Sequence, residues 1–162
     1  MNRFLNTVTT MALLLVVTVS YSLPEDAMQD ILIEAASSEF MLDEGVEVHL
    51  GSESEPARIS QGSMVISGTE IRVERSGNAL IRVTATGTPA RSRQQPQQDQ
   101  AVVYMNAATL VFDNATRIFS ADGNVELMQA EDTITGNHID YYLDTGRARG
   151  DQIQMTIKQA ED

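Results

Sequence analysis

Residues suited to acid–base or metal chemistry are few in this chain. It contains no cysteine and two histidines, His49 and His138. His49 alternates with apolar residues, which predicts a solvent-facing position on a half-buried strand. His138 is out of phase with Ile139, so the same prediction holds for it. Neither histidine has Ser and Asp partners at a spacing that indicates a triad, and the carboxylates are scattered, so we predict no enzyme, metal site or cofactor.

The composition argues against a nucleic-acid-binding protein and against a sugar-binding protein. The 162 residues carry a formal net charge of −12, which would repel nucleic acid because phosphate neutralisation supplies most non-specific affinity for it. Aromatic residues make up 5% and tryptophan is absent, which argues against stacking platforms for sugars. The acidic side chains are typical of a soluble surface. Any ligand is therefore expected to be held by the apolar part of the chain.

The N-terminus has the pattern of an export signal. Arg3 precedes an apolar run over residues 11–19, and the small residues Ser20 and Ser22 follow it at the expected cleavage site. We predict a signal peptide at 1–22 and one domain at 23–162. An uncleaved anchor is the alternative, but the apolar stretch is shorter than a spanning helix requires. An exported chain without cysteine must be stabilised by its core rather than by disulfides.

Beyond residue 30 the chain predicts an all-β domain. Apolar residues alternate with polar ones over short segments that are separated by Gly, Asn and Asp, as in half-buried strands. In the segment 46–50 the valines and Leu50 are expected to face the core, and in 80–86 the inward residues are expected to be Ile81, Val83 and Ala85. The segment 87–100 has two prolines and five glutamines and is predicted to be the longest loop.

An internal repeat organises these strands. Residues 61–73 align without a gap with 129–141, so that Gly68 meets Gly136, and a weaker third copy places Ala107 at that position. A small residue inside a strand pattern marks a corner. Repeated corners would let antiparallel strands bend across two facing sheets. The bulky residue that follows in phase is Val73, Phe112 or Tyr141 in the three copies.

The chain resembles the LptA/OstA family, the periplasmic bridge proteins of lipopolysaccharide transport. The resemblance rests on ILIE at 31–34, ISQG with MVISGTEIRV at 59–73, TGTPA at 86–90, and the segment from GNVEL to GRARG at 123–150. It implies a β-jellyroll of two facing antiparallel sheets, V-shaped and open at both ends. It also implies an apolar groove for the acyl chains of lipopolysaccharide, and copies that join end to end between an LptC-like inner-membrane partner and an LptD-like outer-membrane partner.

The resemblance also suggests where lipid binds. Ile31, Ile33 and Phe112 fall on lipid-contacting positions of the family, and a further position, usually aromatic, falls near Ser92. The full set of predicted lipid-binding residues is Ile31, Ile33, Met64, Ile66, Val83, Leu110, Phe112, Val125 and Tyr141. Such residues can hold acyl chains without salt bridges, but buried apolar strand residues must also fill a core, and plain packing is the alternative for each of them.

Two other functions stay open at this point. The protein could be an LptC-like component of the same pathway that keeps a membrane anchor, or a structural β protein that forms filaments. N-terminal sequencing of the exported protein separates the first alternative from a periplasmic carrier, and lipid binding separates the second. The leading hypothesis is a periplasmic lipid carrier.

Overall fold

The computed structural model of the protein describes residues 26–96 and 100–158, which form one short 3-10 turn and twelve strands. The elements are η1 Asp26–Met28, β1 Leu32–Glu34, β2 Ser37–Met41, β3 Val46–Leu50, β4 Ala57–Gln61, β5 Met64–Gly68, β6 Glu70–Ser76, β7 Ala79–Gln94, β8 Val103–Asp113, β9 Ile118–Gln129, β10 Asp132–Tyr142, β11 Arg147–Asp151 and β12 Gln154–Thr156. The prediction of an all-β domain is confirmed. The predicted signal peptide, 1–22, lies outside the described residues. In the part that is described, we find no helix with the length and apolar character needed to cross a bilayer.

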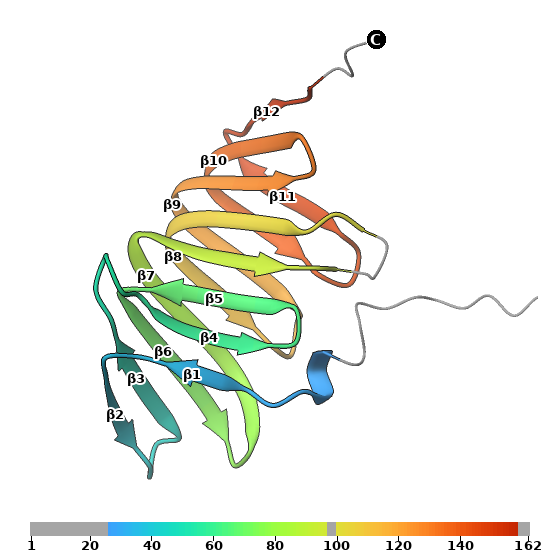
Figure 1. The fold of residues 1–162 in the computed structure, drawn as a ribbon. Helices are drawn as coiled ribbons and strands as arrows, with labels where there is room; N and C mark the ends of the chain where they lie inside the picture. Colours follow the sequence, from blue (N-terminus) through green and yellow to red (C-terminus); the bar gives the residue numbers. More distant parts are fainter. Residues whose placement is uncertain (1–25, 97–99, 159–162) are drawn as a thin grey trace, which may run out of the picture.

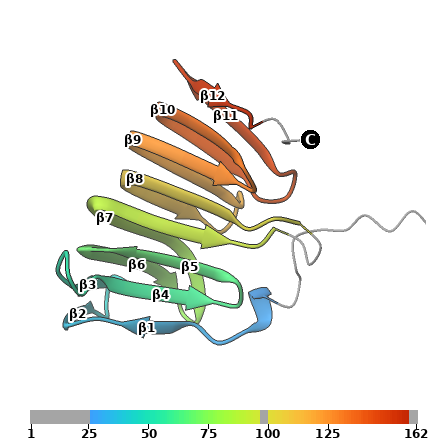
Figure 2. The ribbon, with the colours of Figure 1, turned by 45° about the horizontal axis from the view of Figure 1, so that its top comes forward.

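One continuous antiparallel sheet forms two facing layers (Figures 1 and 2). Layer A contains β2, β3, β6 and β11, and layer B contains β1, β4, β5 and β12. The long strands β7 to β10 belong to both layers. In β7, for example, residues 79–86 pair with β6 and residues 91–93 pair with β5. The layers are thus joined along one side, which gives the predicted V-shaped jellyroll.

Small residues lie where the chain passes from one layer to the other. The pairing of β10 shifts register between Gly136 and His138, and that of β8 shifts between Asn106 and Thr109. Gly68 ends β5 just before the chain enters β6, and a Cβ built on it would overlap the carbonyl oxygen of Thr86. A side chain is therefore sterically excluded there. The corner role predicted from the internal repeat is confirmed.

The inward faces of the two layers form a single hydrophobic core. Alternate residues along each strand point inward, because successive side chains on a strand lie on opposite faces. Large side chains that are fully buried include Ile59, Ile66, Ile71, Met105, Leu110, Phe112, Phe119 and Ile139. The rings of Phe112 and Phe119 lie 4.9 Å apart on neighbouring strands of layer A. The core therefore runs across β4 to β10 without a break.

Two segments differ from the sequence-based prediction. The predicted loop 87–100 is mostly strand, since β7 continues to Gln94 in layer B. Polar residues occupy both faces of this half of β7, which hid the strand in the sequence. The prediction for Ile81 was also wrong: a register shift between Glu74 and Arg75 turns Leu80 inward and leaves Ile81 exposed.

Both ends of the sheet are open. Within the described residues, β1 and β2 each have one unpaired edge at the N-terminal end, and β11 and β12 each have one at the C-terminal end. The edge strands carry apolar side chains that remain exposed, among them Phe40 at the first end and Met155 at the second. The prediction of a jellyroll open at both ends is thus met by the strand pairing.

Candidate lipid-binding interior

The predicted lipid-binding residues come together on the inward faces of the two layers. Ile31 and Ile33 are half-buried at the N-terminal end and contact the core cluster. The remainder are buried: Met64 and Ile66 on β5, Val83 on β7, Leu110 and Phe112 on β8, Val125 on β9 and Tyr141 on β10. Their shared face makes a common lipid surface geometrically possible. Because the central residues are fully covered, a lipid could reach them only if the two layers separate.

A polar cluster lies inside the N-terminal end, where the sequence predicted apolar residues. β3 pairs with β6 so that Glu47 lies opposite Val73 and His49 lies opposite Ile71, and both polar side chains point into the interior. His49 is only 2% exposed, so its predicted solvent-facing position was wrong. The apolar residues Val48 and Leu50 take the outer face instead.

The cluster is internally satisfied. Ser38 Oγ and His49 Nδ1 are 2.7 Å apart, His49 Nε2 lies 3.3 Å from Glu47 Oε2, and Arg75 forms an ion pair with the other Glu47 oxygen. The ring of Phe40 meets that of His49 edge-on at 5.9 Å. Buried charges are tolerated when they are paired and hydrogen-bonded in this way. The interior is therefore apolar through its centre and polar at one corner of its N-terminal end.

Layer B also places polar side chains on the inner wall. Ser92 and Gln94 of β7 are buried, with Ser92 opposite Ile66 and Met105. Gln94 donates a hydrogen bond from Nε2 to Ser63 Oγ at 3.1 Å. The family position near Ser92 is thus an inner-wall position rather than a loop residue. Sequence alone missed Glu47 and His49 because the alternation in β3 favours its apolar residues as the inward ones, and it missed Ser92 and Gln94 because both faces of that half of β7 are polar.

The second histidine lies on the outer face of layer A. His138 Nδ1 is 2.8 Å from Asp122, and its Nε2 is 3.5 Å from Asp140. The hydrogen bond to Asp122 raises the pKa of His138 above its usual value. Ser120 is nearby, but its hydroxyl donates to Asp140 at 2.6 Å. Since both ring nitrogens face carboxylates and the hydroxyl faces a carboxylate too, the cluster lacks the nucleophile–base contact of a triad.

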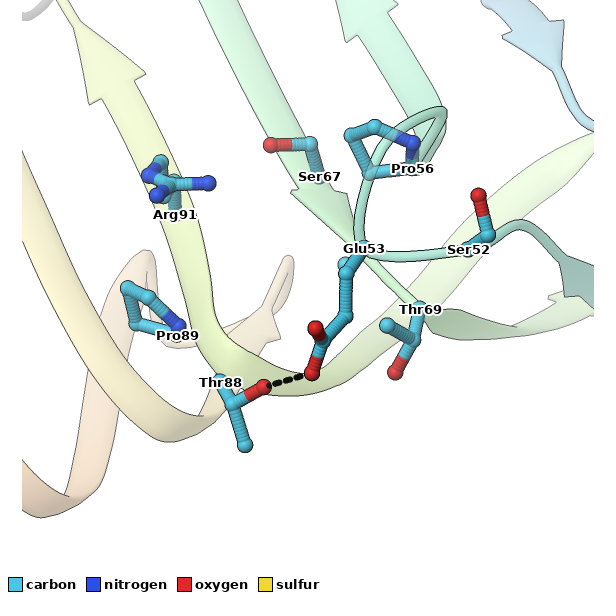
Figure 3. A pocket seen from close by; sticks show the side chains of 9 residues that line it. Ser52, Glu53, Pro56, Ser67, Thr69, Thr88, Pro89 and Arg91 are labelled. Atoms are coloured by element: carbon cyan, nitrogen blue, oxygen red, sulfur yellow. Dashed lines mark hydrogen bonds between the residues drawn. The ribbon is translucent and has the colours of Figure 1, made fainter.

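The surface of the described residues carries several hollows. One of them, with a volume of about 240 Å³, lies between the turn that follows β3 and the bend of β7. Figure 3 shows its polar lining, which includes Ser52, Ser67 and Arg91. Thr88 donates a hydrogen bond from Oγ1 to Glu53 Oε1 across it at 2.7 Å. None of the predicted lipid-binding residues lines this hollow, so it is distinct from the apolar interior.

Comparison with known proteins decides the family. Residues 56–147 match the family model described as LptA/(LptD N-terminal domain) LPS transport protein. The chain belongs to this family of lipopolysaccharide transport proteins. It is also 30% identical over 139 residues to the lipopolysaccharide export system protein LptH of Pseudomonas aeruginosa, a match that covers 82% of this chain and 77% of LptH.

The fold agrees with that of a solved member. The crystal structure of LptH, the LptA-homologous periplasmic component of the conserved lipopolysaccharide transport device of Pseudomonas aeruginosa, superimposes with a TM-score of 0.76 at 24% identity. The match covers 84% of this chain and 100% of the LptH chain. The resemblance to the LptA/OstA family drawn from the sequence is confirmed.

Proposed function

We propose that this protein is a periplasmic, non-enzymatic carrier that shields the acyl chains of lipopolysaccharide and forms part of a bridge from the inner to the outer membrane. One observation carries the proposal: an interior that is apolar through its centre extends along the sheet towards unpaired edge strands at both ends of the described fold. A bridge needs a path that continues into its neighbours, and no strand among the described residues closes either end of this interior. Residues 1–22 would serve as the signal for export.

The energetics of holding a lipid favour such an interior. Each acyl methylene removed from water contributes about 0.8 kcal/mol, so several methylenes offset the cost of parting the inner side chains. The two layers are joined at the bends of β7 to β10. On the side opposite these bends the turns of each layer face one another, and the gap between them is the mouth of the V. An acyl chain would enter at this mouth and leave its phosphorylated sugars in water, away from the acidic surface.

The two ends differ in charge, which favours head-to-tail joining. β11 at the C-terminal end carries exposed Arg147 and Arg149 beside one exposed acid, Asp151, whereas Glu34 and Glu39 are exposed on β1 and β2 at the N-terminal end. An added strand would satisfy the unpaired backbone groups of an edge. The same addition would bring opposite charges together. We propose that copies join in this way, and that LptC-like and LptD-like domains continue the sheet at its ends.

Photo-crosslinking from β1 tests the carrier function. A photoreactive amino acid at Ile33, which points into the open N-terminal end, is expected to form an adduct with lipopolysaccharide in cells. Ile33 is preferable to Phe112, because Phe112 is 0% exposed and a bulky substitute there would disturb the core.

Leu32 is the matched control for this experiment. It is the preceding residue of the same strand, but it points outward and is 58% exposed. The photoreactive group at Leu32 is expected to give little or no adduct. Equal labelling from both positions, or none from Ile33, would contradict binding in the interior.

A substitution in β12 tests end-to-end joining. Met155 lies on the inner face opposite Ile134 and is half exposed at the C-terminal edge. Met155→Glu is expected to weaken self-association about ten-fold or more, because burying a methionine contributes about 1.5–3 kcal/mol and a carboxylate resists burial. Sedimentation velocity over a range of concentrations measures the change. Gln154→Glu on the outer face of β12 is the control, and an equal effect from both variants would rule out docking through the inner face.

A further inference from the structure

Tyr141 carries a buried hydroxyl that the fold leaves without a partner. The residue lies on the inner face of layer A, between Phe119 of β9 and Ala148 of β11, and it is 2% exposed. Its hydroxyl has no hydrogen-bond partner within the described part of the chain. A buried hydroxyl without a partner loses its hydration and gains nothing in return, so it destabilises the unoccupied interior.

Three other buried polar side chains of the inner wall have partners. Glu47 pairs with Arg75, His49 with Ser38, and Gln94 with Ser63. Burial raises the pKa of Tyr141 above its usual value, so the phenol is neutral and able to donate at physiological pH. The hydroxyl of Tyr141 is therefore a donor with unused capacity, on a residue whose neighbours on the two adjacent strands, Phe119 and Ala148, are apolar.

The position of the hydroxyl along the strand indicates which part of a ligand it could meet. The layer A half of β10 runs from the bend at Gly136 to the last residue of the strand, Tyr142, and the following turn lies at the mouth of the V. The hydroxyl is 3.9 Å from where a Cβ on Gly146 of this turn would lie. It thus sits near the mouth rather than at the bend. If an acyl chain enters with its methyl end first, the oxygen atoms at its head end stay near the mouth, at the depth of the Tyr141 hydroxyl.

We propose that the Tyr141 hydroxyl donates a hydrogen bond to an oxygen at the head end of a bound acyl chain, either the carbonyl or a chain hydroxyl. This inference rests on the proposed carrier function and deepens it. The residue makes the C-terminal part of the interior selective for oxygen-bearing acyl chains over plain hydrocarbon. Such selectivity arises because a ligand without the oxygen leaves the donor unpaired.

Tyr141→Phe tests this assignment, because it removes the hydroxyl and keeps the ring. Binding of purified lipopolysaccharide, measured by isothermal titration calorimetry, is expected to weaken about five- to ten-fold. The midpoint of thermal unfolding without ligand is expected to stay unchanged or rise, since an unpaired group has been removed. Weaker binding without a loss of stability is the diagnostic pair of results.

Tyr142→Phe is the matched control, since Tyr142 is the next residue and pairs with Arg147 on the outer face. It is expected to leave the affinity unchanged. An unchanged affinity for Tyr141→Phe, or a fall in both affinity and unfolding temperature, would overturn the proposal, the second because it shows that the hydroxyl has a partner in the unoccupied fold. Failure of the unsubstituted protein to bind lipopolysaccharide would instead overturn the carrier function.

A second pair of probes identifies the acceptor. The loss caused by Tyr141→Phe is measured for sodium tetradecanoate and for sodium 3-hydroxytetradecanoate. A larger loss for the hydroxylated chain assigns the chain hydroxyl as acceptor, and equal losses assign the carboxyl oxygen. No loss for either probe, with no loss for lipopolysaccharide, contradicts the hydrogen bond.

Discussion

Replacing Gly68 with alanine is expected to lower the free energy of unfolding by about 3 kcal/mol, because the new methyl group would overlap the carbonyl oxygen of Thr86. The obstacle is backbone, which cannot rotate away as a side chain can. Thr86 ends the layer A half of β7, so any relief must move the bend itself. A loss of this size corresponds to a fall of roughly 10 °C in the midpoint of thermal unfolding.

Gly136→Ala is the matched control, since Gly136 occupies the equivalent position of the internal repeat. A Cβ there would lie 3.2 Å from Cγ2 of Ile153, an exposed side chain near the C-terminal edge that can move. We expect a loss of less than about 1 kcal/mol. Circular dichroism during urea unfolding measures both variants, because the chain has no tryptophan to report by fluorescence. Equal losses for the two alanines would show that the overlap at Gly68 is not the cause.

Phe112→Ala is expected to lower the free energy of unfolding by about 4 kcal/mol, the usual cost of deleting a fully buried phenylalanine. Phe112 is 0% exposed, contacts the ring of Phe119 and lies under the guanidinium of Arg117, 5.5 Å from the ring centroid. The substitution removes these contacts and leaves a cavity in layer A. Urea unfolding again gives the measurement.

Phe40→Ala is the control for this prediction. Phe40 lies on β2 and is 56% exposed, so its replacement is expected to lower the free energy of unfolding by less than about 1 kcal/mol. Similar losses at the two positions would mean that the centre of the sheet is no better packed than its edge. The expected difference also bears on lipid binding, because reduced transport in Phe112→Ala would report lost stability as much as a lost contact. Ile33, at the open end, separates the two effects.

Much of the architecture could be predicted from local pattern. Alternation with period two identified the strands, and the aligned Gly68 and Gly136 predicted corners between two layers before any pairing was known. The physical reason is that a pleated strand must alternate its faces and a corner must exclude a side chain. The family resemblance then predicted that the jellyroll is open at both ends and that its apolar groove binds lipid.

The alternation of apolar and polar residues did not reliably predict which face of each strand points into the interior. In β3 the alternation of Val48 with Glu47 and His49 favours the apolar face as the inward one, but the structure turns the polar face inward. Pairing with β6 decided it, since Glu47 lies opposite Val73 and Arg75 is close enough to form an ion pair with it. The inward position of Ser92 was also decided by strand pairing. The sequence did not reveal its strand, because the residues on both faces of that half of β7 are polar.

The sequence by itself determined that this chain is a series of short amphipathic strands with glycine corners, because alternation and steric exclusion act over a few residues. Only the tertiary structure decided which polar groups lie inside, since that depends on register between strands far apart in the chain. Register placed Glu47 and His49 in a satisfied cluster at the N-terminal end. At the C-terminal end it buried Tyr141, and within the described residues no neighbour accepts a hydrogen bond from its hydroxyl.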